Sequence, residues 1–459
     1  MGAFDGISVA LSGLHAQRRA MDTAAQNVAN ANTVGYTRQR VSLTAVGAST
    51  VPAVWSTPSS AAGGVAVSGV LRVQDSILTT ASREAHALES NLSASADALG
   101  SIESLFAEPS DNGLATQLSA LWSSFHDVAN QPSDPAVRSQ VLQRATVVTD
   151  WLNQASSQLT SQASATTATV GTLLTQVNTT AHQLADLNVA ILRAGQSAES
   201  TNELADQRDQ LALKLSEMVG GTSTTDASGN INVRIGGSEL VAGSTVRELS
   251  LVSSGGLALV KWSQDGSPAT IPSGQIGGLV DAVNTTIPAW SAKLDSLAAN
   301  LAGQVNALHQ SGYDLNGTLG GPLFTGTTAA TLKVAISDPR AIAASGVAPT
   351  AGVPSLDVKV ADALGNLGGS VTSPDSVYRQ IVSDLGIAAQ SATTRVGTQS
   401  GIAANIDNSA AAVSGVSIDE EMTNIITFQR AYEAAGRVLT AVDATLDTLI
   451  NHTGLVGRA

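Results

Sequence analysis

Apolar side chains recur at alternating steps of three and four residues at both ends of this 459-residue chain, and this spacing restricts what those ends can form. The N-terminal series comprises Phe4, Ile7, Leu11, Leu14, Arg18, Met21, Ala25 and Val28, of which seven are apolar. The C-terminal series comprises Ile425, Phe428, Tyr432, Ala435, Leu439, Val442, Leu446 and Leu449. Each series places one narrow stripe on a helix, which favours pairing with another helix over burial in a globular core.

Two interpretations of these stripes are open. A heptad stripe is more often one face of an intramolecular bundle than an assembly surface. These stripes are long and thin, however, and they lie at the extreme ends of the chain, where most domains fray. We therefore predict terminal coiled-coil helices with an assembly interface made by Phe4, Ile7, Leu11, Leu14, Met21, Val28, Ile425, Phe428, Tyr432, Leu439, Val442, Leu446 and Leu449.

The interior alternates long helical patterns with short strand-like runs. Helix starts are marked by Asp134 before Pro135, by Ser200-x-x-Glu203 and by Ser417-x-x-Glu420. The predicted helices span 75–107, 112–129, 135–191, 273–311 and 374–412. Residues 33–72 look extended and loop-like, and the predicted strands span 64–73, 230–235, 246–252, 257–262, 332–336 and 356–360.

The predicted fold class is mainly α, a long-helix bundle with terminal coiled-coil helices and a small β-rich inserted module. The pattern divides the chain into three nested units: a terminal coiled-coil assembly domain (1–50 and 412–459), a helical bundle domain (51–219, 273–311 and 373–411), and a β-rich module (220–272 and 312–372). We expect the two stretches of the module to pack as one unit.

The residue types that catalysis and metal binding require are sparse. The sequence has no cysteine, its six histidines are scattered, and no common phosphate-loop, metalloprotease or nucleophile signature occurs. Asp314-x-Asn316-Gly317 resembles half of a calcium loop without its distal Glu, so we interpret it as a β-turn. Asp206-Gln-Arg208-Asp209 is interpreted as a solvated helix face with local ion pairs. We predict a structural protein that is not an enzyme and uses no cofactor or metal.

Charge and hydropathy exclude further classes. With 23 Lys and Arg against 37 Asp and Glu, the net charge is −14, which argues against binding nucleic acid. No apolar stretch approaches the ~20 residues that cross a bilayer. The start lacks a basic segment followed by an apolar core. We expect no nucleic-acid partner, no membrane insertion and no cleaved signal peptide.

Several motifs resemble a known family. Residues 27–40 (NVANANTVGYTRQR) and 11–14 (LSGL) are similar to the N-terminal signature of bacterial flagellar rod, hook and hook-associated proteins. Residues 414–421 (SGVSIDEE) and 428–439 (FQRAYEAAGRVL) resemble their C-terminal signature. Val34 stands where the family commonly has Pro, which should soften that turn.

Internal motifs narrow the resemblance. Residues 201–211 (TNELADQRDQL), 134–138 (DPAVR), 312–317 (GYDLNG) and 323–326 (LFTG) resemble the family of hook-associated protein 1, the first junction protein between hook and filament. The terminal motifs are specific to the axial family, whereas these internal ones narrow the resemblance to this branch. Together they span most of the chain.

The resemblance implies a structural adaptor that assembles on the distal hook and connects it to the filament. The implied partners are the hook protein, the next hook-associated protein, further copies of itself in a ring, the flagellar export apparatus and an export chaperone. It also implies an extracellular place at the hook–filament junction, reached by type III export. Two alternatives stay open: another axial protein (a rod, hook or flagellin relative), and a flagellar surface adhesin that uses the β-rich insert.

Overall fold

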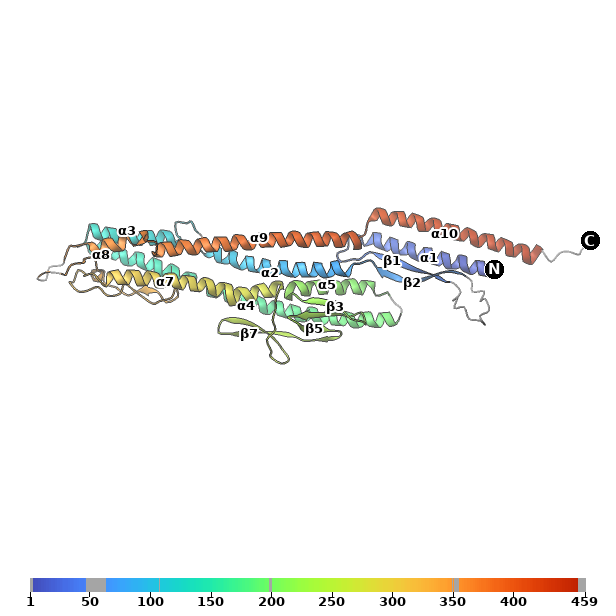
Figure 1. The fold of residues 1–459 in the computed structure, drawn as a ribbon, viewed down its shortest axis with the longest axis horizontal. Coiled ribbons are helices and arrows are strands. Elements are labelled where there is room, and N and C mark those ends of the chain that lie inside the picture. Colours follow the sequence, from blue (N-terminus) through green and yellow to red (C-terminus); the bar gives the residue numbers. More distant parts are fainter. Residues whose placement is uncertain are drawn as a thin grey trace, which may run out of the picture.

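The structure, a computed structural model, is an elongated molecule with both chain ends at the same end of the long axis (Figure 1). It describes residues 3–46, 63–106, 108–197, 200–348, 350 and 355–452. The α-helices are α1 (Ala3–Ala29), α2 (Ser76–Phe106), α3 (Leu114–Asn130), α4 (Pro135–Gln196), α5 (Asn202–Val219), α6 (Gly274–Asp281), α7 (Ile287–His309), α8 (Lys359–Gly365), α9 (Pro374–Ser414) and α10 (Ile418–Asp447). The strands are β1 (Gln39–Val46), β2 (Gly64–Arg72), β3 (Thr222–Thr225), β4 (Ile231–Ile235), β5 (Ser238–Ala242), β6 (Thr245–Val246), β7 (Leu249–Ser254), β8 (Leu257–Trp262), β9 (Phe324–Thr325) and β10 (Lys333–Val334).

The long helices form the body of the molecule and the terminal helices form an arm at one end of it. Helices α2, α4 and α9 run along the body, with α3, α7 and α8 at the far end (Figure 1). Helices α1 and α10 pack together in the arm, and the β1–β2 hairpin packs on α1. The predicted fold class is therefore confirmed: the chain is mainly helical, its terminal helices pair, and its sheets are small and antiparallel.

Side-chain caps explain where the long helices begin. Asp134 accepts a hydrogen bond from the backbone N–H of Ala136, and Pro135 occupies the first helical position, where its missing N–H has no cost. Ser373 caps α9 and Ser417 caps α10 in the same way. The prediction at Ser200 is wrong, because α5 begins at Asn202 and Glu203 instead accepts a hydrogen bond from Gln26 of α1.

The helix predicted over 273–311 is interrupted by a π-helical turn, η1 (Ala282–Thr286). Pro288 follows this turn and has no N–H to donate to a preceding carbonyl, which favours a local change of helix type. Within the turn, Asn284 donates to the carbonyl of Ala258 and accepts from its N–H. The irregularity therefore fastens strand β8 to the helix.

The strands divide between two hydrophobic clusters. Strands β3–β4–β5–β6 form one antiparallel sheet and β7–β8 a hairpin, and both contribute to a cluster with α4, α5 and α6. Strands β9 and β10 instead lie in the larger cluster at the far end, with α3, α4, α7 and α9. The two stretches expected to pack as one β-rich module thus pack on different parts of the helical body.

Two further sequence expectations differ from the structure. The stretch 33–72, expected to be loop-like, contains β1, which pairs antiparallel with β2 from Gln39 opposite Arg72 to Val46 opposite Gly64. The strand expected at 356–360 is replaced by helix α8, whose Val360, Ala361 and Leu364 are buried in the far-end cluster. Short apolar runs fit a strand or a buried helix equally well, and packing decides between them.

Candidate functional site: the polar junction between arm and body

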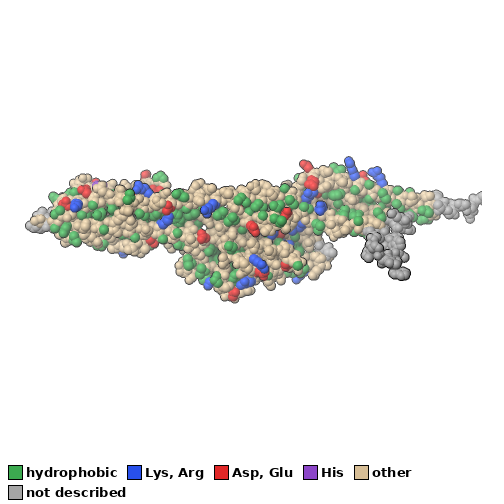
Figure 2. Space-filling view, viewed as in Figure 1, with side chains coloured by type: hydrophobic (Ala, Val, Ile, Leu, Met, Phe, Trp, Pro, Cys, Tyr) green, Lys and Arg blue, Asp and Glu red, His purple; other side chains and the backbone are tan. Residues whose placement is uncertain are grey.

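The predicted seam residues lie in the arm, where α1 and α10 run antiparallel. A Cβ atom added to Gly6 would come within 3.3 Å of Val442 Cγ2, and one added to Gly13 would lie 3.9 Å from Ala435 Cβ. A side chain at Gly6 would therefore be tight against α10, whereas one at Gly13 would make an ordinary contact. Hydrophobic side chains remain visible over the arm in Figure 2.

Most, but not all, of the predicted interface residues are at least half-buried in the structure. Tyr432 of α10 and Leu449 of the following π-helical turn, η4 (Thr448–His452), are exposed, and on α1 Leu11 is 45% exposed. The side chain of Phe4 lies outside the described residues. The remaining predicted residues are half-buried: Ile7, Leu14, Met21, Val28, Ile425, Phe428, Leu439, Val442 and Leu446. The arm is therefore an incompletely covered pair of helices.

Small side chains, which the sequence reasoning left out, supply the buried face of α1. Ala10, Ala16, Ala20 and Ala24 are at most 5% exposed. Helix α1 is covered by the β1–β2 hairpin as well as by α10, and a short side chain leaves room for both. The three/four spacing of large apolar residues could not reveal this second contact.

A buried carboxylate ties the base of α10 to the N-terminal segment. Glu421 is 2% exposed and accepts hydrogen bonds from Arg38 Nε at 2.8 Å and from Asn27 Nδ2 at 3.2 Å. Arg38 also pairs with exposed Glu420, and this pairing raises the pKa of the guanidinium. The Arg38 backbone N–H donates to the carbonyl of Ser414, at the end of α9.

Asn27 is the centre of the N-terminal half of this cluster. Its Oδ1 accepts from the Tyr36 hydroxyl at 2.8 Å and from the Gln39 backbone N–H at 2.9 Å. Its Nδ2 donates to the Gln39 carbonyl as well as to Glu421. Burial, followed by nearby Asp206, raises the pKa of Tyr36 to about 12, so its hydroxyl stays a donor at neutral pH.

Helix α5 holds the other half of the cluster through two carboxylates. Arg72 at the end of β2 forms ion pairs with Asp206, at 2.8 Å, and with Asp209. Arg83 of α2 pairs with the second oxygen of Asp209 at 2.9 Å. Burial raises the pKa of Asp206, whereas the bond from Thr37 and the charge of Arg72 act in the opposite direction.

We call this cluster the polar junction: Asn27, Tyr36, Thr37, Arg38, Gln39, Arg72, Arg83, Asn202, Asp206, Asp209, Glu420 and Glu421. It joins α1, α2, α5, α10 and the hairpin where the arm meets the body. The loop before Arg38 is pressed against α5. Gly35 has φ +79°, a Cβ there would overlap Gln210, and Gln210 donates to the Val34 carbonyl. Val34 itself is 88% exposed, so nothing packs on its side chain.

The interpretation of Asp206-Gln-Arg208-Asp209 as a solvated helix face is wrong. Asp206 is 6% and Arg208 8% exposed, and the ion pairs run to β2 and α2 instead of along the helix. A charged segment predicts a solvent-exposed helix face, because the sequence does not show that a hairpin and a second helix cover it. Three charged side chains among four consecutive residues, in a chain with few charges, were the one available signal.

The ion pairs and hydrogen bonds of the polar junction are suited to holding the arm and the body at a fixed angle.

Among the described residues no group of three or more His, Asp or Glu side chains is placed to hold a metal ion. Asp314 accepts from the backbone N–H groups of Asn316 and Thr318, as in a turn. No helix in the described ranges is long and apolar enough to span a membrane.

Comparison with known proteins identifies the class. A model of the flagellar basal body rod protein family matches residues 7–37, and one of the C-terminal region of the basal body rod FlgEFG proteins matches residues 408–452. These ranges cover most of the two terminal signatures and of the paired helices of the arm. Both ends of the chain thus match families of flagellar axial proteins.

Between these ends, a model of the helical domain of the flagellar hook-associated protein FlgK matches residues 99–324. Flagellar hook-associated protein 1 of Bacillus subtilis (strain 168) is 31% identical to this chain over 505 aligned positions, covering 99% of both chains. Its Escherichia coli (strain K12) counterpart is 26% identical, covering 97% of this chain and 99% of its own. The chain belongs to the flagellar hook-associated protein 1 family, a family of structural proteins and not of enzymes.

The fold is shared with a solved structure. The flagellar hook junction protein FlgK from Burkholderia pseudomallei superposes with a TM-score of 0.63 at 18% sequence identity, covering 74% of this chain and all of the other. At this identity the similarity concerns the fold alone.

Proposed function

We propose that this chain is the adaptor that assembles on the distal end of the hook and connects it to the filament. The observation that supports this most directly is the arm: a pair of terminal helices that is incompletely covered in the isolated chain. Ile418, Met422, Ile426, Val438 and Ile450 are each between 47% and 70% exposed. Ile418, Met422 and Ile426 recur every four residues along α10, and such a row of exposed large apolar side chains normally needs a partner surface.

The proposed partners of the arm are neighbouring axial subunits. Copies of this chain would form a ring, with the hook protein below it and the next hook-associated protein above it. The predicted interface residues of both seams would then contact neighbouring subunits wherever the α1–α10 pair leaves them exposed. The polar junction would hold the arm at a fixed angle to the body, so that a force on one is transmitted to the other.

We further propose that the chain leaves the cell unfolded through the flagellar type III export apparatus, aided by an export chaperone. The absence of cysteine means that no disulfide has to be reduced before passage. Aromatic residues make up 3% of the chain, so few large side chains have to be extracted from the core on unfolding.

The proposed domain division keeps a terminal unit, a helical body and strand-containing inserts. A boundary at residue 50 would separate β1 from β2, so the whole hairpin is assigned to the terminal unit. A variant lacking residues 1–73 and 415–459 should stay soluble and melt cooperatively, because both hydrophobic clusters remain complete. A trimmed chain that aggregates or melts without cooperativity would argue against this division.

Electron microscopy of flagella from a deletion strain tests the function. Cells that lack the chain should carry hooks without filaments, and complementation with the wild-type chain should restore them. Immunogold labelling of complemented cells should mark a single position between hook and filament. Labelling along the whole hook or filament would favour another axial protein, and normal filaments on the deletion strain would favour the adhesin.

A further inference from the structure

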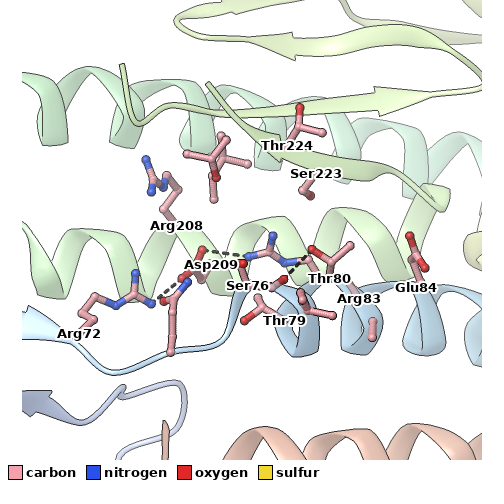
Figure 3. A pocket seen from close by; sticks show the side chains of 15 residues that line it. Arg72, Ser76, Thr79, Thr80, Arg83, Glu84, Arg208, Asp209, Ser223 and Thr224 are labelled. Carbon is pink, nitrogen blue, oxygen red and sulfur yellow. Dashed lines mark hydrogen bonds and ion pairs between the residues drawn. The ribbon is translucent and has the colours of Figure 1, made fainter. Parts of the chain in front are cut away.

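A cavity of about 630 Å³ lies beside the polar junction, between α2, α5 and strand β3. Figure 3 shows side chains reaching it from these three elements. Arg83 comes from α2, Arg208 from α5, and Ser223 and Thr224 from β3. The cavity is lined by both polar and apolar side chains and lies in the body, so the assembly surfaces proposed for the arm do not account for it.

Arg208 is a buried cation without a matching anion. Its side chain donates through Nη1 to the Gly229 carbonyl at 2.7 Å and to Asn188 Oδ1 at 3.3 Å. Within the described part of the chain it forms no ion pair, and its Nε is buried without a hydrogen-bond partner. A buried guanidinium is costly unless an anion balances it.

The other arginines at this cavity, Arg72 and Arg83, already use the nearby carboxylates, so a positive charge stays unbalanced. Asp209 is shared by Arg72 and Arg83, and Asp206 pairs with Arg72. Three guanidinium groups are therefore served by two carboxylates. Desolvation is the largest influence on the pKa of Arg83 and of Arg208, and it lowers both.

Two other carboxylates are close but are engaged with solvent or backbone. Glu84 lines the cavity and is exposed. Asp226 accepts from the backbone N–H groups of Ser228 and Asn230 in the turn before β4. Neither forms an ion pair with Arg208 or Arg83.

A hydroxyl group completes the set of free donors. Ser223 Oγ is buried without a hydrogen-bond partner. Arg83 bonds Asp209 through Nη2 and also lines the cavity. Guanidinium forks and hydroxyls are the groups that bind phosphate, sulfate and carboxylate oxygens.

We propose that this cavity binds a small oxyanion, held by Arg83, Arg208 and the Ser223 hydroxyl. The anion would supply the negative charge that the three arginines lack. It would also link α2, α5 and β3, and so fasten the β3–β6 sheet to the helical body. The oxyanion could be free phosphate or sulfate, or a carboxylate, and the experiment separates these sources.

The test uses the full-length chain. Thermal unfolding and isothermal titration are measured with inorganic phosphate and, separately, with acetate, each against sodium chloride at equal ionic strength. We expect phosphate to raise the melting temperature saturably, because a ligand that binds the folded state stabilises it. Saturation by acetate but not by phosphate would identify the site as a carboxylate site.

Variants locate the effect. Arg208→Met should abolish the saturable response, and Ser223→Ala should weaken binding roughly tenfold, the effect of losing one hydrogen bond to a charged group. Ser223→Ala removes an unpartnered hydroxyl and decides the matter if Arg208→Met fails to fold. Arg234→Met is the matched control, because Arg234 lies on β4 in an exposed pair with Glu239. No saturable response to either anion, or an unchanged response in Ser223→Ala, would overturn the proposal.

Discussion

Replacing Arg38 by Met should loosen the arm from the body without unfolding the body. The change leaves the Glu421 carboxylate, 2% exposed, with Asn27 as its remaining hydrogen-bond donor among the described residues. Breaking a fully buried ion pair costs about 3–5 kcal/mol. Because the Arg38 side chain is 20% exposed and Asn27 still donates to Glu421, we expect about 2–3 kcal/mol here.

Amide hydrogen exchange measures this loss where it occurs. If α10 opens as a unit, 2–3 kcal/mol corresponds to roughly 30- to 140-fold faster exchange in the first turns of α10. The amides of 141–159 in α4 should not change, because the large far-end cluster buries that segment. A global melting temperature alone would not separate opening of the arm from unfolding of the body.

Two further variants make the reasoning refutable. Arg38→Met combined with Glu421→Met should recover most of the protection, since replacing both partners of a buried pair by apolar groups is often neutral. Glu420→Gln is the control, because Glu420 meets the same arginine from an exposed position and should leave exchange unchanged. Equal exchange in wild type and Arg38→Met, or a double variant as fast as the single one, would show that the buried pair does not hold the arm.

Three other outcomes are expected. Leu439→Asp, which places a carboxylate on the half-buried face of α10, should leave the melting of the body intact but fail to restore filaments in the deletion strain; normal swimming would contradict the proposed interface. Burial lowers the pKa of His309 from its ordinary 6.5, and its Nε2 accepts a hydrogen bond from the Ala343 N–H. Neutral His309 therefore stabilises the fold above about pH 6.5, and this contribution is lost as the pH falls. The difference in melting temperature between wild type and His309→Leu should shrink from pH 7.5 to pH 5, and a constant difference would exclude the mechanism. EDTA should leave the melting temperature unchanged, and stoichiometric zinc or calcium in the purified chain would refute the prediction that no metal is needed.

Local sequence signals were sufficient for most helices and for the class of protein. Asp134 and Pro135, Ser373 and Ser417 mark helix starts because a cap acts within a few residues of the backbone it satisfies. The three/four spacing predicts the helix pair of the arm, because this spacing can be recognised in each helix without knowing its partner. The terminal signatures also identify the family from local sequence, since each signature consists of contiguous residues.

Contacts between distant segments required the tertiary structure. Glu421 meets Asn27 and Arg38 from nearly the other end of the chain, and Asp209 meets Arg72 and Arg83 from a third segment. Whether a charged side chain is solvated or buried depends on what covers it, and here a hairpin hidden in an apparently loop-like stretch provides part of that cover. The sequence by itself determined the helices and their stripes, whereas only the tertiary structure decided which charges are paired, because burial is a property of neighbours that the local pattern does not contain.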